Sequence, residues 1–150
     1  LACSNPELPQ QEIANDTYIS QEIQDACVKY AEEYDICPEL IMAMVETESS
    51  GDQYAKNGNC LGLMQISTKW HKDRMEKYAV EDIYDIDDNI HLGVDYLSEL
   101  IEQNGDEISY ILDLYNGNSK AEWNLEHGVL SSYSYKILTR AAELERIHGK

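Results

Sequence analysis

Residues 87–101, DDNIHLGVDYLSELI, carry the clearest helical pattern in the chain and decide its fold class. Apolar residues recur there every three or four positions, which is the period of an α-helix that buries one face. The stripe consists of Ile90, Gly93, Val94, Leu97, Leu100 and Ile101. Asp87 and Asp88 suit the first turn of a helix, and Gly105 suits its end. The stretch therefore predicts a long amphipathic helix.

Four more helices are predicted on either side of this one. Their approximate ranges are 19–35, 38 to 47 or 49, 107–115 and 132–147. Pro38 is a favoured first helical residue, and Gly51 follows the end of the helix that Pro38 begins. No stretch alternates with a period of two, but residues 60–67, CLGLMQIS, are expected to form a short extended piece or a tight turn around Gly62. The fold class predicted is mainly α, in a single domain.

The composition is that of an acidic globular protein. The 150 residues suit one domain, which we expect to be monomeric, and 43% of them are hydrophobic. The net charge of -18 argues against nucleic acid and anionic lipid surfaces, because phosphate binding needs clustered Lys and Arg. No apolar run approaches the roughly 18 residues of a membrane-spanning helix. The chain has 11 Tyr and two Trp, which suit a sugar-binding groove and a half-buried core equally well.

Residues 1–17, LACSNPELPQQEIANDT, differ from the rest of the chain. They hold two of the three prolines and little periodicity, so they are predicted to be a tether or a poorly ordered segment before a domain at 18–150. The opening Leu-Ala-Cys is compatible with a lipidated Cys3 and equally with a cloning boundary. We expect an exported protein, anchored as a lipoprotein through its N-terminus or part of a larger exported protein.

The cysteines and acidic residues do not form a recognisable metal motif. There is no Cys-x-x-Cys pair, so zinc is disfavoured. One disulfide among Cys27, Cys37 and Cys60 would suit an exported protein, and three buried thiols are the alternative. An EF-hand loop counted from Asp85 fails, because it lacks Gly at position six and Glu at position twelve. We predict no metal and no cofactor.

Two glutamates near the end of the second predicted helix differ in orientation. Each residue turns an α-helix by about 100°, so relative to Ile41 the side chain of Glu48 lies at about -20° and that of Glu46 at about +140°. Glu48 therefore continues the buried stripe, and Glu46 is predicted to be a solvated surface charge. Burial raises the pKa of a carboxyl group, which is what a general acid near neutral pH needs. A structural carboxylate that caps the backbone or pairs with a cation is the alternative for Glu48.

Four short motifs in a fixed order resemble those of the lytic transglycosylases with a lysozyme-like fold. They are Ala-x-x-x-x-Glu-Ser at 43–49, Gly-Leu-Met-Gln at 62–65, Asn-Ile with Gly-x-x-Tyr-Leu at 89–97, and Tyr-Asn at 115–116. The resemblance covers about residues 19–140 and places the family's catalytic glutamate on Glu48. A further aromatic residue of the family is assigned to Tyr135, with Tyr133 as the alternative. The chain departs from the family at Asn59 and Cys60, where Gly-Ala is common, and at LYNGNS.

The resemblance implies a lysozyme-like domain, with a groove between helices, that cleaves the glycan strands of peptidoglycan. Such a protein would be extracellular or associated with the cell wall. Glu48 would protonate the oxygen between N-acetylmuramic acid and N-acetylglucosamine. It would then take a proton from the 6-hydroxyl of the muramic sugar, which attacks its own anomeric carbon and gives a 1,6-anhydro end. Proximity of this hydroxyl replaces a protein nucleophile. The substrate-binding residues implied by the resemblance are Ser49, Gly62, Met64, Gln65, Tyr115, Asn116 and Tyr135.

The implied roles of these residues differ. Ser49 and Gln65 would hydrogen-bond the substrate or orient Glu48, and the Tyr115 hydroxyl would lie near the carboxyl group. Asn116 would shape a turn or bind sugar, and Tyr135 would line the groove. Gly62 would allow a close backbone approach. Met64 would pack under a sugar ring, with a core position as its alternative.

Two other functions remain open from the sequence. A hydrolytic muramidase of the same fold would use water and give a reducing end, and Asp52 would be its candidate second carboxylate. A glycan-binding module that has the fold without turnover is the other alternative. The presence of Glu48 together with Gln65 and Tyr115 argues against this module.

Overall fold

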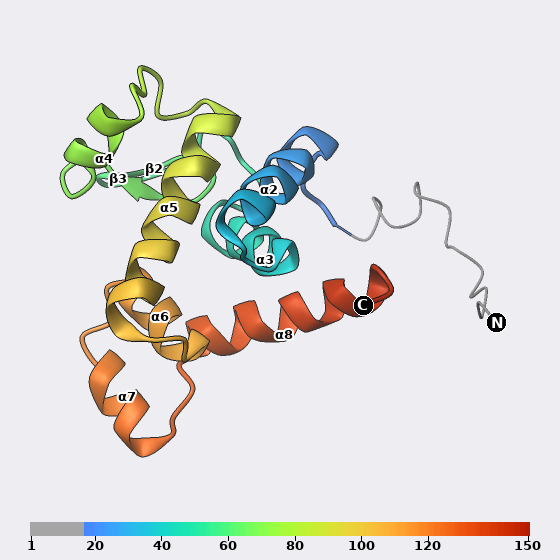
Figure 1. Ribbon diagram of the computed structural model, residues 1–150, viewed down its shortest axis with the longest axis vertical. Helices are drawn as coiled ribbons and strands as arrows, with labels where there is room; N and C mark the ends of the chain where they lie inside the picture. The colour runs from blue at the N-terminus through green and yellow to red at the C-terminus, as the bar shows by residue number, and fades with distance from the viewer. Residues whose placement is uncertain (1–16) are drawn as a thin grey trace.

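The helix predicted from residues 87–101 is helix α5, Ile86–Asn104, in the computed structural model of the protein (Figure 1). The side chain of Asp85 caps its first turn by accepting a hydrogen bond from the backbone N–H of Asp88. Gly105 ends the helix with a φ of 87°. The buried face of α5 contacts both α2, Gln21–Tyr34, and α6, Ile108–Tyr115. Helix α5 thus connects the part of the domain that contains α2 with the part that contains α6.

The structure describes residues 17–150, and these are mainly helical as predicted. The remaining helices are α3 Pro38–Ser49, α4 Lys72–Lys77, α7 Ala121–His127 and α8 Ser132–Ile147. Helices α4 and α7 were not predicted, because α4 has no buried residue and α7 buries only Ala121 and Asn124, so neither has an apolar stripe. The tether predicted at 1–17 lies outside the described residues except for Thr17, which is buried.

Residues 56–67 form a small antiparallel sheet between α3 and α4. Its strands are β1 Lys56–Asn57, β2 Cys60–Leu61 and β3 Ile66–Ser67, in the order β1-β2-β3. Cys60 of the central strand lies opposite Asn57 on one side and Ser67 on the other. The predicted turn is also present, since Gly62 has a φ of 80° just after β2. Strands of two residues are too short to show an alternating pattern in the sequence.

Helix α3 lies between α2 and α8 and is covered on more than one face. Glu46 of α3 is only 3% exposed and forms an ion pair with Arg140 of α8, whose Nε lies 2.6 Å from a carboxylate oxygen. The prediction that Glu46 is a solvated surface charge is therefore wrong. The helical projection identified one buried face of α3, but α8 covers a second face. Arg140 of α8 also supplies the cation that the buried Glu46 carboxylate needs.

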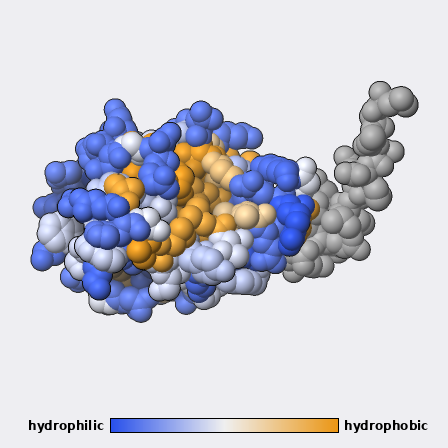
Figure 2. Space-filling model, turned by 90° about the horizontal axis from the view of Figure 1, so that it is seen from below, coloured by the Kyte–Doolittle hydropathy of each residue, from blue (hydrophilic) through white to orange (hydrophobic). Residues whose placement is uncertain are grey.

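One face of the protein carries an apolar patch. Seen from below, apolar side chains gather in the middle of one face and polar side chains border them (Figure 2). Cys27, Cys37 and Cys60 are free thiols, so no disulfide joins them. The alternative of three buried thiols is correct for Cys27 alone, since Cys37 and Cys60 are only partly buried. Cys3 lies outside the described residues. None of the helices in the described range is long and apolar enough to cross a membrane.

Candidate active site

Glu48 lies in the last turn of α3, at the edge of the core. The helix ends at Ser50, whose φ of 54° is in the left-handed region. The hydroxyl of Tyr133, near the start of α8, donates a hydrogen bond to Glu48 Oε1. Burial raises the pKa of Glu48, and the hydrogen bond from Tyr133 lowers it in part. The net direction is upward, so the carboxyl group keeps its proton at a higher pH than an exposed glutamate would.

Glu48 opens into a cavity of about 270 Å³. The other described residues that line it are Asn57, Cys60, Gln65, Tyr115 and Asn116. Three predicted site residues, Gln65, Tyr115 and Asn116, are therefore gathered around the carboxyl group, together with Asn57 and Cys60, which the sequence did not single out as site residues. Glu48 is the single carboxylate among these lining residues.

The backbone of Met64 is fixed from two sides of the cavity. Its N–H donates to Asn89 Oδ1 of α5 at 2.8 Å, and its carbonyl accepts from the Tyr115 hydroxyl, also at 2.8 Å. Asn89 is fully buried and donates its amide hydrogens to the carbonyls of Leu61 and Ile83. Backbone groups thus satisfy the hydrogen-bonding atoms of the Asn89 side-chain amide. Together with the bond from Tyr115, these contacts hold the loop that carries Gln65 against α5 and α6.

Two glycines allow this close packing. A Cβ atom on Gly62 would lie 2.3 Å from Asn89 Nδ2, so the close approach expected at Gly62 is to Asn89. A Cβ atom on Gly93 of α5 would lie 2.3 Å from Met64 Sδ. The Met64 side chain is 0% exposed, so it occupies the core position that was its alternative and does not line the cavity.

Gln65 has a φ of 53° and its side chain folds back onto its own loop. Its Nε2 donates to the carbonyls of Gly62 at 3.0 Å and Ala55 at 3.3 Å, and its Oε1 accepts from Asn57 Nδ2 at 2.9 Å. These bonds stabilise a backbone conformation that is uncommon outside glycine. Gln65 therefore shapes the wall of the cavity, and contact of its amide with substrate remains a prediction.

The remaining predicted site residues differ in their position relative to the Glu48 cavity. The Ser49 hydroxyl is buried and donates to the carbonyl of Val45 one turn earlier, at 3.0 Å. Asn116 is exposed at the end of α6 and lines the cavity. Burial and then the charge of Glu48 hold the pKa of Tyr115 well above its usual range, so its hydroxyl stays protonated. Asp52 is exposed in the loop after α3, where its carboxylate accepts from the N–H of Tyr54, and it does not line the Glu48 cavity.

Tyr133, and not Tyr135, is the tyrosine of α8 that reaches Glu48. Tyr135 is 62% exposed. The position of Tyr133 could have been found in the sequence, because it lies four residues before Ile137, a residue of the inward stripe, on the same helical face. Tyr135 lies two residues before Ile137 and points elsewhere.

A buried carboxylate on α6 fixes the start of α8. Asp113 is 2% exposed, and its Oδ1 accepts hydrogen bonds from the hydroxyls of Ser131 and Ser134. Its Oδ2 accepts from Asn124 Nδ2 of α7 at 3.1 Å. Ser131 is also the N-cap of α8, so Asp113 lies where the helix dipole favours negative charge. Because Tyr133 lies between the two serines, this cluster sets where its hydroxyl points.

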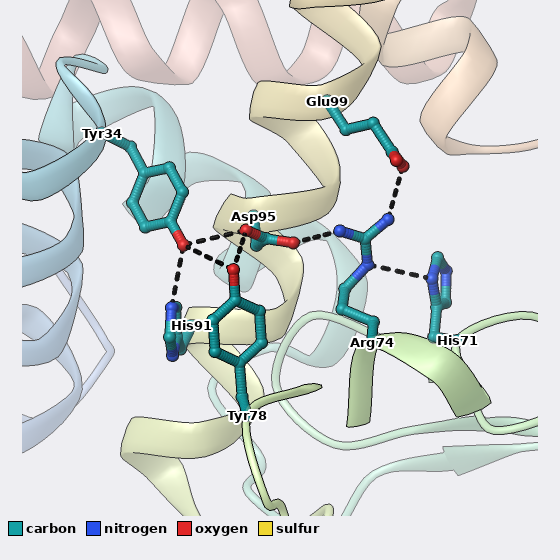
Figure 3. Close-up of polar contacts among 7 residues, drawn as sticks. All are labelled: Tyr34, His71, Arg74, Tyr78, His91, Asp95 and Glu99. Atoms are coloured by element: carbon teal, nitrogen blue, oxygen red, sulfur yellow. Dashed lines mark hydrogen bonds and ion pairs between the residues drawn. The ribbon is translucent and has the colours of Figure 1, made fainter. Parts of the chain in front are cut away.

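A second polar cluster holds α4 against α5 (Figure 3). Asp95 of α5 accepts from the hydroxyls of Tyr34 and Tyr78 and forms an ion pair with Arg74 of α4. Tyr34 also hydrogen-bonds His91 at 2.9 Å. Arg74 Nε lies 3.4 Å from His71 Nδ1. His91 and Asp95 are therefore hydrogen-bonded within this cluster, and His71 lies beside the sheet, where its backbone N–H donates to the carbonyl of Ser67.

Comparisons with known proteins concern the chain as a whole and give one family and two curated relatives. A family model described as the transglycosylase SLT domain matches residues 25–132. The chain is 30% identical over 107 residues to a transglycosylase of Enterobacteria phage PRD1, covering 71% of this chain and 38% of the phage protein. It is 32% identical over 84 residues to the membrane-bound lytic murein transglycosylase E of Buchnera aphidicola, covering 51% of this chain and 38% of that protein.

A solved structure supports the fold. The inactive mutant of the lytic transglycosylase Slt from Pseudomonas aeruginosa matches with a TM-score of 0.69 and 21% identity, over 81% of this chain and 24% of that one. Of the two curated relatives, the chain spans 38% of the length of each. The family model covers well over half of the chain and includes α3, the small sheet, α5 and α6. The chain therefore belongs to the transglycosylase SLT domain family.

Proposed function

We propose that this domain is a peptidoglycan lytic transglycosylase in which Glu48 acts first as the general acid and then as the base. The observation that carries the proposal is a single, partly desolvated carboxyl group in a cavity of the family's fold. Burial raises the pKa of Glu48, which favours the protonated form that a general acid must have. Family membership and the names of the relatives support the substrate class.

The reaction would proceed in two proton transfers at one carboxyl group. Glu48 would protonate the glycosidic oxygen between N-acetylmuramic acid and N-acetylglucosamine as the bond to the anomeric carbon breaks. The 6-hydroxyl of the muramic sugar would then bond to that carbon and return its proton to Glu48. The product would be a 1,6-anhydro end, and no water would be consumed. Tyr133 would stabilise the carboxylate that exists between the two steps.

The absence of a second carboxylate from the described lining of the cavity favours this route over hydrolysis with two carboxylates. A retaining or inverting hydrolase would use a second acid as nucleophile or base. Asp52 is the candidate for that role, but it is exposed and outside the Glu48 cavity. We infer that the protein acts at the cell wall, where this substrate lies, and one relative's name describes that protein as membrane-bound.

The test is a digestion of purified peptidoglycan with the wild-type protein and with Glu48→Gln, followed by mass spectrometry of the products. We expect anhydro-muropeptides from the wild type and a rate lower by about 10²- to 10⁴-fold from Glu48→Gln. Glu33→Gln, which changes an exposed glutamate of α2, is the matched control and should retain activity. Products heavier by one water would instead identify a hydrolytic muramidase. No release by a folded wild-type protein would favour the glycan-binding module.

A further inference from the structure

A cavity of about 430 Å³ lies at the opposite end of α3 from Glu48, and we call it the α2–α3 cavity. Its walls come from α2, from the first turns of α3 and from the residues that follow α8 (Figure 1). Glu39 at this end of α3 is nine residues before Glu48, which corresponds to about 14 Å along the helix axis. No described residue lines both this cavity and the Glu48 cavity, so the two are separate.

The α2–α3 cavity contains a buried carboxylate that already binds an ammonium group. Glu39 is 1% exposed, and the ammonium nitrogen of Lys150 lies 2.8 Å from its Oε1 and 3.0 Å from its Oε2. Burial raises the pKa of Glu39, but hydrogen bonds from Lys150 and His148 prevail and lower it to about 2, so the carboxylate is ionised near pH 7. The Lys150 side chain is 51% exposed, so a ligand ammonium can take its place at the cost of few other contacts.

A buried nitrogen at this cavity has no hydrogen-bond partner. His148 lines the cavity, and its Nδ1 lies 3.0 Å from Glu39 Oε1. An ionised carboxylate only accepts hydrogen bonds, so Nδ1 carries a proton. The Nε2 of His148 is the one buried side-chain nitrogen or oxygen of residues 17–150 that has no partner. In the neutral ring this Nε2 is an acceptor, which an N–H group of a ligand would satisfy.

The lining of the α2–α3 cavity combines excess negative charge with apolar surface. Asp25 and Glu32 of α2 line it together with Glu39, so three carboxylates face the single ammonium group of Lys150. The net charge of -18 also attracts cations to the protein as a whole. The apolar part of the lining is formed by Val28, Pro38 and Met42. This combination matches a cation on an alkyl chain, whose stem lies on apolar surface while its charged head meets a carboxylate.

We propose that the α2–α3 cavity binds a primary alkylammonium group, whose head replaces the Lys150 ammonium on Glu39 and whose alkyl stem lies against Val28 and Met42. The side chain of a lysine in a peptide and a free polyamine both carry this chemistry. Lys150 is then an internal competitor for the site. The proposal goes beyond the proposed function and does not depend on it, because no glycan at Glu48 is required.

The test uses the methyl groups of the four methionines as reporters in a ¹³C-methyl NMR spectrum. Met42 lines the cavity, and Met42→Leu assigns its signal. The other three, Met44, Met64 and Met75, do not line it and serve as internal controls. The probe is Nα-acetyl-lysine N-methylamide at low salt, where charge pairs are least screened. The matched control ligand is the same molecule with its ε-amine acetylated, which keeps the stem and removes the charge.

We expect the amine to shift the Met42 signal alone and the acetylated ligand to shift none of the four. The same titration with spermidine identifies the source of the ligand. Tighter binding of the lysine derivative would assign the site to a peptide side chain, and tighter binding of spermidine would assign it to a free polyamine. Either ranking supports an alkylammonium site.

Three variants test the contacts themselves. Lys150→Ala removes the internal ammonium, and we expect it to bind the lysine derivative about two- to fivefold more tightly than the wild type does. Asp25→Asn combined with Glu32→Gln removes two carboxylates, and we expect it to bind about two- to tenfold more weakly. Glu33→Gln changes an exposed glutamate of α2 outside the cavity, so it is the matched control and should bind like the wild type.

Three outcomes would overturn the proposal. The first is a Met42 signal that the amine leaves unchanged in both the wild type and Lys150→Ala. The second is an equal shift with the acetylated ligand, which would show that the charge is not recognised. The third is an affinity for the amine that neither Lys150→Ala nor the change of Asp25 and Glu32 alters relative to Glu33→Gln. None of these measurements involves peptidoglycan, so their failure is distinct from a failure of the proposed function.

Discussion

Tyr133 and Glu48 are 85 positions apart in the sequence, and the hydroxyl of Tyr133 donates a hydrogen bond to the Glu48 carboxyl group. The proton affinity of Glu48 is therefore set by two opposing effects. Burial in the wall of the cavity raises its pKa, and the hydrogen bond lowers it. The hydrogen bond can be removed while the ring of Tyr133 is kept, because Phe lacks only the hydroxyl.

Replacement of Tyr133 by Phe should raise the pKa of Glu48 further, because it removes the hydrogen bond that lowers it. A general acid loses activity as the pH rises through its pKa, so the alkaline limb of the pH–rate profile should move to higher pH. We expect the rate at the optimum to fall about two- to tenfold, the usual effect of one lost hydrogen bond. The measurement is kcat/KM on peptidoglycan fragments as a function of pH.

Tyr135→Phe is the control for this prediction, because Tyr135 is exposed on the same helix. Its pH profile should coincide with that of the wild type. An alkaline limb that stays in place or moves to lower pH in Tyr133→Phe would show that the hydrogen bond does not tune Glu48.

The buried carboxylate of Asp113 should be important for stability. Asp113→Asn replaces one carboxylate oxygen by an NH2 group, which donates and does not accept. That oxygen is either the acceptor from Asn124 or the acceptor that Ser131 and Ser134 share. Either way a buried group loses its partner, which should lower the free energy of unfolding by about 1–3 kcal/mol. Urea denaturation measures the change. Asp106→Asn, in the exposed loop before α6, should leave stability within about 0.5 kcal/mol of the wild type.

Gly93→Ala should destabilise the protein although alanine is the better helix former. The helix propensity gains about 1 kcal/mol. The new Cβ atom, however, would lie 2.3 Å from Met64 Sδ and 2.8 Å from Met64 Cβ, and overpacking of this kind costs about 1–3 kcal/mol. Thermal unfolding of Gly93→Ala, Met64→Ala and the double variant measures the destabilisation caused by the close contact between residues 93 and 64. The double variant should cost less than the sum of the two single changes, and strict additivity would contradict the contact.

Glu39 should make stability depend on pH in the acid range. Burial opposes its ionisation, but hydrogen bonds from Lys150 and His148 prevail and lower its pKa from 4.5 to about 2. Because the folded-state pKa is below the unfolded one, the stabilisation is complete above about pH 4.5 and is lost as the pH falls towards 2.

Glu39→Gln should therefore lower the free energy of unfolding by about 1–3 kcal/mol at pH 7, and the difference from the wild type should shrink through this window. Denaturation at several pH values measures it, and Glu33→Gln is the exposed control. A difference that is the same at pH 7 and pH 2 would rule out the proposed ion pairs as its cause.

The sequence was sufficient for elements that bury one clear stripe. Helix α5 begins within a residue or two of the predicted start and ends at the predicted glycine, and α8 occupies the predicted range. Elements without a stripe could not be found in this way. Helix α4 has no fully buried residue; Arg74 pairs it with Asp95 of α5, and Met75 packs against the core while only partly buried. Such pairs depend on tertiary geometry that no local pattern contains.

The candidate site was only partly accessible to the sequence. The helical projection placed Glu48 on the core face, and the resemblance to the family's motifs then assigned the catalytic role to it. Glu46 was misjudged because α8, more than 80 residues later, covers the opposite face of α3 with Arg140. Tyr135 was assigned by resemblance, with Tyr133 as the alternative, and the phase of α8 relative to its cap at Ser131 brings Tyr133 to Glu48. Long-range packing and the start of a helix decide both cases.

The pairing of α3 with α8 has a consequence for synthesis of the protein. Glu48 leaves the ribosome long before Tyr133, and Asp113 has no partners from Ser131 and Ser134 until α8 follows. A nascent or prematurely terminated chain that stops before residue 132 contains Glu48 but lacks Tyr133, whose hydroxyl lowers the pKa of Glu48. It also lacks α8, the helix that covers α3. Competence of the site is thereby tied to completion of the last helix.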